Sequence, residues 1–242
     1  MSKDVSFLSG FGDGGRDNIQ QSDLKNPYLS IAAKTSAAVN KNKKEAYIEG
    51  LEVGDFYNTL TKEVYGKKVK LIYLAHAVSW DEYKPGGGDF VGKHRPHSIL
   101  VSETWPMKTK EGNDVKEAYN FVVLICGKEE QGPVLFTLKG SGIKHAKSWL
   151  NAMNILRLPE SDELAPLFGG IWELESKYNE KSGNDWFTIG VGKDSAVKNA
   201  GFITEKTFSD FVKPGLEIAK GMTKIQERKE LPDNSQDELE DI

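Results

Sequence analysis

The sequence has few of the residues and segments that build disulfide-linked, zinc-binding or membrane-spanning proteins. Its 242 residues include one cysteine, Cys126, which excludes an intrachain disulfide framework and zinc-finger spacings. No apolar run approaches the roughly 18 residues that span a bilayer. The first 17 residues also lack the basic and apolar segments of a signal peptide. We therefore expect a protein of a reducing cytoplasm that makes no contact with a membrane.

Familiar catalytic motifs are missing as well. The chain has no G-x-x-x-x-G-K-[ST] phosphate loop and no G-x-S-x-G elbow. His94 and His97 could supply two metal ligands, but Pro96 between them disfavours a helix that presents both on one face. We expect no enzymatic activity, no cofactor and no metal. A metal-dependent nuclease stays open as an alternative, because a fold can assemble carboxylates that are distant in sequence.

Basic residues are absent from the last thirteen positions. Residues 230–242 contain six acids and neither lysine nor arginine. The remaining residues, 1–229, hold 30 acids against 32 basic residues, so this body is mildly basic although the whole chain has a formal charge of −4. Tails of one charge sign are often interaction segments.

The order of apolar patterns and turn residues predicts a protein that is mainly β, with helices. We expect a glycine-rich flexible arm over residues 1–27 and a loop-rich insert over 80–116. The predicted strands cover 46–53, a hairpin over 54–66, 67–79, 117–126, 133–138, 171–178 and 185–191. A helix capped by Ser141 is predicted over 142–153, and two short helices divided by Pro214-Gly215 precede the tail.

Three strands, a helix and two further strands are the order of a five-stranded OB-fold barrel. The long insert then lies between its first and second strands. We divide the chain into the N-terminal arm (1–27), an OB-fold DNA-binding domain (28–203), C-terminal helices (204–229) and a disordered acidic tail (230–242). Other five-stranded barrels and α+β sandwiches fit the same order of elements.

Cationic and aromatic residues alternate through the insert and the strands after it. Proteins bind single-stranded DNA by stacking bases on aromatic rings and by placing cations along the phosphates. The candidate DNA-binding residues are Trp80, Tyr83, Lys84, Lys93, His94, Arg95, Trp105, Lys108, Tyr119, Phe121, Lys139, Lys144 and Lys147. Aromatic residues in strands more often fill a core, so Tyr119 and Phe121 have that alternative.

Two stretches resemble a widespread group of tailed-phage proteins. The first runs from Gly54 to Gly66 and is followed by Trp80-Asp81 and a glycine-rich piece ending at His94. The second runs from Leu138 to Trp149. The resemblance covers roughly residues 45–192, and together with the OB order and the tail it implies a tailed-phage single-stranded DNA-binding protein. Such a protein would act in DNA replication and recombination, in the cytoplasm of the infected bacterial host.

The tail is similar in design to those through which such proteins recruit polymerase, primase or helicase. Its candidate partner-binding residues are Asp237, Glu238, Glu240, Asp241 and Ile242. Related tails usually end in an aromatic residue, whereas this tail ends in Ile242. A phage interaction protein that does not bind DNA is the remaining alternative.

Truncation after Lys229 tests the tail. A tethered polyanion has a high effective concentration at a basic groove, so its removal should raise the affinity for single-stranded DNA at low salt. It should also abolish partner binding without unfolding the domain. Anisotropy titrations of both proteins with labelled oligo-dT measure the first effect, and equal affinities at low ionic strength would contradict the competition.

Overall fold

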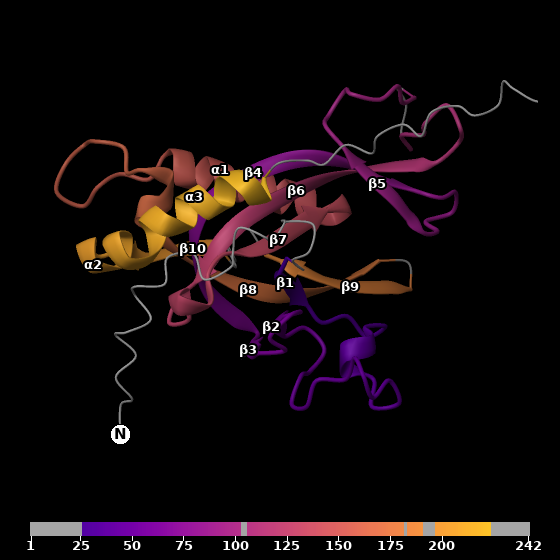
Figure 1. Ribbon diagram of the computed structural model, residues 1–242, viewed down its shortest axis with the longest axis horizontal. Coiled ribbons are helices and arrows are strands. Elements are labelled where there is room, and N and C mark those ends of the chain that lie inside the picture. Colours follow the sequence, from indigo (N-terminus) through magenta and orange to yellow (C-terminus); the bar gives the residue numbers. More distant parts are fainter. Residues whose placement is uncertain (1–25, 103–105, 182, 191–196, 224–242) are drawn as a thin grey trace, which may run out of the picture.

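Ten strands form one sheet, which curls into a half-barrel (Figure 1). The computed structural model describes residues 26–102, 106–181, 183–190 and 197–223. The strands are β1 (Tyr28–Ile31), β2 (Phe56–Asn58), β3 (Val64–Gly66), β4 (Lys68–Tyr83), β5 (Phe90–His94), β6 (Asp114–Ile125), β7 (Val134–Lys139), β8 (Gly170–Lys181), β9 (Asn184–Ile189) and β10 (Val197–Phe202). The helices are α1 (Ile143–Asn154), α2 (Glu205–Thr207) and α3 (Lys213–Met222).

Strands β4 and β6, of 16 and 12 residues, lie at the centre of the sheet. Its strand order is β10-β8-β4-β6-β7-β1-β2-β3, with β5 paired to β4 and β9 paired to β8. The pairing of β1 with β7 is parallel and covers only Leu135 and Phe136 of β7, whereas the other pairings are antiparallel. The outer edge of β7 is therefore unpaired beyond Phe136 within the described chain.

Both faces of the central strands are buried because their side chains alternate between two cores. Phe121 and Val123 of β6 belong to a core that α1 covers with Ala146, Trp149 and Met153. Val122 and Leu124 point the other way, into a core closed by Val212 and by Ala219 of α3. The two helices thus cover opposite faces of the sheet.

A β-bulge in β4 changes which of its residues face α1. The register with β6 shifts between Tyr73 and Ala75. Before the bulge, Leu71 and Tyr73 lie in the α1 core, and after it His76 stacks on Phe121 of that core. Odd-numbered residues beyond the bulge consequently point to the α3 face, as expected when one extra residue is inserted into a ladder.

Much of the predicted order of elements is confirmed. The hairpin over 54–66 contains β2 and β3, and the predicted strands over 67–79, 117–126, 133–138, 171–178 and 185–191 correspond to β4, β6, β7, β8 and β9. Helix α1 buries Ala146, Trp149 and Met153 at helical spacing, as predicted.

The strand predicted over 46–53 is wrong. Backbone bonds from Ala46 and Tyr47 to the Lys43 carbonyl make local turns there, and Gly50 has a positive φ of 76°. Ile48 and Leu51 are buried in a small satellite core instead of a sheet. The apolar residues of segment 46–53 favour a strand, but in the structure this segment consists of turns and loops that bury Ile48 and Leu51.

Three other details also differ from the expectations. Residues 80–116 are less loop-rich than predicted, because Trp80–Tyr83 extend β4 and β5 lies between the loops. Ser141 makes no cap, since it belongs to a short 3-10 turn, Gly140–Gly142, and Gly142 takes the cap position without a side-chain bond. Pro214 and Gly215 lie in the first turn of α3 rather than between two helices.

The OB-fold prediction is met only in part. The five predicted barrel strands follow in the expected order as β4, β6, β7, β8 and β9, with α1 before β8. They belong, however, to a ten-stranded sheet, and within the described residues no pairing joins β7 to β9 to close a barrel. The regions 1–25 and 224–242 lie outside the described residues. They include most of the predicted N-terminal segment (1–27) and the whole acidic tail (230–242).

Gly54 gives a test of the packing between the hairpin and β9. A Cβ on Gly54 would lie 2.5 Å from Cε1 of Phe187, and its φ is +89°. We expect Gly54→Ala to lower the free energy of unfolding by about 2–3 kcal/mol through strain and overpacking. Gly50→Ala, also at positive φ but with open space around it, should cost about 1 kcal/mol. Denaturant titrations that give equal losses would contradict the packing role.

Candidate functional site

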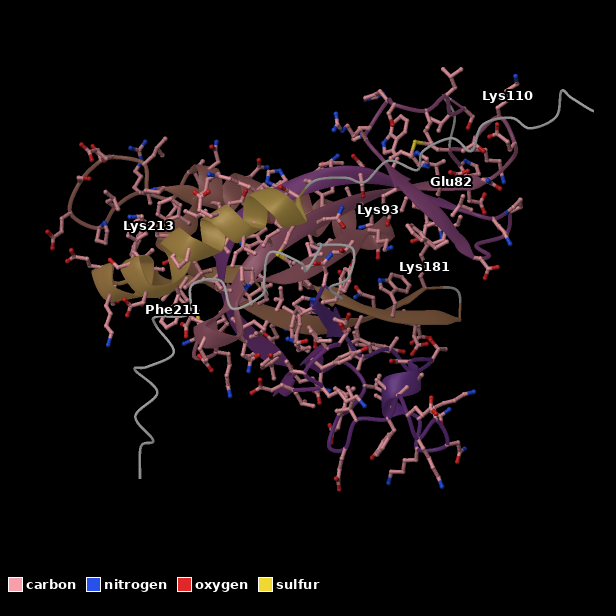
Figure 2. All side chains as sticks on the ribbon, viewed as in Figure 1. Glu82, Lys93, Lys110, Lys181, Phe211 and Lys213 are labelled. Atoms are coloured by element: carbon pink, nitrogen blue, oxygen red, sulfur yellow. The ribbon has the colours of Figure 1, made fainter. Side chains whose placement is uncertain are left out.

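A cavity of about 760 Å³ opens beside the unpaired edge of β7. Its walls come from β1, the end of β7 with the turn after it, β9, and the arm, which we define as residues 80–117. The arm contains β5 and extends from the half-barrel (Figure 1). In Figure 2, Lys93 of the arm lies between β5 and the β8–β9 hairpin.

Two lysines and one buried aspartate line this cavity. Asp81 is only 1% exposed, and its carboxylate accepts hydrogen bonds from Ser79 Oγ at 2.8 Å and Lys139 Nζ at 3.1 Å. Lys139 Nζ also donates to Tyr83 Oη at 2.7 Å. The β4 bulge makes this possible, because it turns Ser79, Asp81 and Tyr83 towards the face that carries Lys139.

Asn120 connects the second lysine to the same network. Its Oδ1 accepts from Lys93 Nζ and from Thr137 Oγ1, each at 3.0 Å. Its Nδ2 donates to Ser79 Oγ at 2.9 Å. Six side chains from four strands are thereby joined into one hydrogen-bonded chain: Lys93, Asn120, Ser79, Asp81, Lys139 and Tyr83.

Burial affects the two amines differently. Burial lowers the pKa of Lys93, and the charge of Lys139 adds to this effect while Asp81 opposes it. Burial acts in the same direction on Lys139, but the bond to Tyr83 and the nearby Asp81 outweigh it and raise the pKa of that amine. The Lys139 ammonium therefore balances the charge of the Asp81 carboxylate. The Lys93 ammonium has a neutral partner, the side-chain amide of Asn120.

Aromatic rings complete the cavity wall. Tyr83, Phe90, Trp186 and Phe187 all line it. The Tyr83 ring is already engaged, with Nζ of Lys116 at 5.1 Å and Nζ of Lys139 at 5.4 Å from its centroid. Phe90 packs edge-on against Tyr83 at 5.7 Å and is 53% exposed. Phe90 thus offers the more accessible flat surface.

The opposite face of the arm holds a separate polar cluster. Glu82 Oε2 lies 2.8 Å from His94 Nε2, and Glu82 Oε1 accepts from Asn113 Nδ2 at 2.6 Å. Glu82 also lines a second cavity of about 350 Å³. Figure 2 shows Glu82 away from Lys93 along the arm. In the described part of the chain, no group of three or more His, Cys, Asp or Glu residues could hold a metal ion.

Of the predicted DNA-binding residues that the structure describes, three line the large cavity: Tyr83, Lys93 and Lys139. Lys93 was expected on a loop but lies in β5. Tyr119 and Phe121 are buried on the α1 side, where Phe121 packs 4.8 Å from Trp149, so no face of Phe121 is free for a base. Trp80 is buried against His97.

The other predicted residues that the structure describes lie away from this cavity. Lys84 pairs with Asp89, Lys108 pairs with Asp114, and His94 pairs with Glu82. Arg95 is exposed at the end of β5. Lys144 and Lys147 are exposed on α1, where Lys147 Nζ lies 5.9 Å from the Tyr119 ring centroid. Trp105 and the tail residues Asp237, Glu238, Glu240, Asp241 and Ile242 lie outside the described residues.

Sequence reasoning missed several residues of the site. Asp81 lies in the predicted insert, Asn120 and Thr137 are polar residues of predicted strands, and no local pattern joins the three. Trp186 and Phe187 carried a usable signal, because they follow the turn between the last two predicted barrel strands, a region that borders the ligand groove in OB folds. Phe90 lies within the interleaved aromatic and cationic residues of the arm.

No helix of the described residues is long and apolar enough to cross a membrane. A family model described as Pam3 phage gp34-like protein matches residues 4–217. Neither a curated protein nor a solved structure matches the chain.

Asp81→Asn tests the network. The change removes the carboxylate that pairs with the Lys139 ammonium. That ammonium then lies near a second one, on Lys93, with no negative charge between them. A fully buried pair would lose about 3–5 kcal/mol, but the Lys139 side chain is 40% exposed, so we expect a loss of about 2 kcal/mol in unfolding free energy. Asp89→Asn removes an exposed pair and should cost less than about 0.5 kcal/mol. Similar losses in the two variants, measured by denaturant titration, would refute the role of Asp81.

Proposed function

Because the chain belongs to the family of Pam3 phage gp34-like proteins, we propose that it is a phage protein that binds single-stranded DNA in the large cavity. Binding is non-enzymatic and does not depend on base sequence. It takes place in the cytoplasm of the infected host, during replication or recombination.

The observation that carries this proposal is the combination of cations and rings at one cavity. Lys93 and Lys139 supply N–H donors for phosphate oxygens, and Phe90 and Trp186 supply flat apolar surfaces that line the same cavity. Single-stranded DNA requires both, since its backbone is anionic and every base has a π-face. Residues from β4, β5, β7 and β9 converge there, so the site is built on strands rather than on loops.

The position of the cavity supports an OB-like use of the sheet. In OB folds, oligonucleotides bind on the face of the second and third strands, between the loop after the first strand and the loop after the fourth. If β4, β6, β7, β8 and β9 are taken as these strands, the arm is the first loop and the β8–β9 turn is the second. We propose that this half-barrel is an opened OB fold on that basis.

The acidic tail has a separate proposed role. Its carboxylates, among them Asp237, Glu238, Glu240 and Asp241, would recruit phage polymerase, primase or helicase to covered strands. The proposal rests on the charge of residues 230–242 and their resemblance to the tails of other single-stranded DNA-binding proteins.

Phe90→Ala tests the stacking surface. Loss of one base–ring stack is worth about 1–3 kcal/mol, so the affinity for labelled oligo-dT should fall by about tenfold or more in anisotropy titrations. Leu60→Ala removes a side chain of similar exposure, 52%, from the β2–β3 hairpin and should leave the affinity unchanged.

The salt dependence of the wild-type protein serves as a second readout. The logarithm of the affinity should fall with the logarithm of salt concentration by about 0.7 per neutralised phosphate. Absence of oligo-dT binding by the wild-type protein at low salt would refute the proposal and favour a phage interaction protein that does not use DNA.

A further inference from the structure

Three lysines lie close to one buried carboxylate on this face of the sheet, and two of them, Lys93 and Lys139, line the cavity. Asp81 is paired in register with Lys93 of β5 on one side and with Lys116 of β6 on the other. Lys139 of β7 completes the set through its ion pair with Asp81. Lys116 and Lys139 both lie over the ring of Tyr83, so the cations share one patch of the sheet.

The patch carries an excess of positive charge. Three lysines against Asp81 leave two positive charges, since the nearby Asp114 and Asp89 pair with Lys108 and Lys84. Lys93 and Lys116 form no ion pair with any described residue, and the described partner of the Lys93 ammonium is the neutral Asn120 amide. A partly buried cation without a counter-ion is costly, and a bound anion would remove that cost.

The hydrogen-bonding capacity of the patch is also incompletely used. An ammonium group has three donors. Within the described chain, Lys93 uses one of its donors, for Asn120, and Lys139 uses two, for Asp81 and Tyr83. The remaining donors suit a group with several acceptor oxygens, and the cavity beside them is accessible.

We propose that this patch binds a phosphate monoester, namely the terminal phosphate of a DNA strand. The inference rests on the proposed DNA binding and names the part of the strand that the lysines hold. An internal phosphodiester carries one negative charge, whereas a monoester carries about 1.5 to 2 at neutral pH and has three acceptor oxygens. The monoester therefore matches the excess of two charges better. Phe90 and Trp186 are then placed to contact the terminal base.

A competition assay tests the proposal. Unlabelled short oligo-dT strands displace labelled oligo-dT from the protein, and they end in a 5′-phosphate, in a 3′-phosphate or in hydroxyls at both ends. We expect one phosphorylated strand to compete roughly tenfold better than the hydroxyl strand, as a charged hydrogen-bonded group adds that order of affinity. Lys93→Met, Lys139→Met and the exposed Lys116→Gln should each reduce the preference. Lys144→Met, on α1, should retain it in full.

Melting temperatures identify variants that fail to fold, and Lys116→Gln keeps the test valid because its side chain is on the surface. Equal competition by all three wild-type strands would overturn this inference and leave DNA binding intact. Failure of every strand to bind would overturn the proposed function instead. Thymidine 5′-monophosphate distinguishes the source of the phosphate: if it competes as well as the phosphorylated strand, the patch takes a free nucleotide and the assignment to a strand end is wrong.

Discussion

The structure depends on the burial of both faces of β4 and β6. Alternate side chains enter the α1 core and the α3 core, so the central strands must be apolar on both faces wherever a helix covers them. Helix α3 covers only part of its face, around Leu74 and Leu124. Beyond that part, the same face of the same strands carries Asn120 and Asp81, and there the polar network replaces the apolar core.

The bulge in β4 determines where this replacement occurs. Without the extra residue, Asp81 and Tyr83 would point to the face of Leu71 and Tyr73, which is opposite the face that carries Lys139. With the bulge, the carboxylate meets Lys139 and Ser79. A buried charge is tolerated only when such partners are present, so the network depends on the bulge.

This dependence explains what the sequence could predict. Alternation and turn residues located β6, β7, β8 and β9, and helical spacing located α1, because these signals are local. They do not reveal which face a strand presents to a helix. Tyr119 and Phe121 were therefore assigned to a DNA surface, although they face α1, while Asn120 between them faces the site. The short strands β1 and β10 pair with strands that are distant in sequence. β5 forms a hairpin with the end of β4, which extends beyond the strand predicted over 67–79.

The arm shows how the site is fixed before any ligand arrives. Consecutive residues of β5 point to opposite faces, so Lys93 reaches Asn120 while His94 reaches Glu82. Both contacts hold β5 against its neighbours. They already restrict the Lys93 side chain, so it loses less conformational entropy when it binds a ligand. A cation ordered in this way binds an anion with less loss of entropy than a mobile surface lysine such as Lys144. The same contacts keep its ammonium partly desolvated, which would strengthen its attraction for the phosphate that we propose it binds.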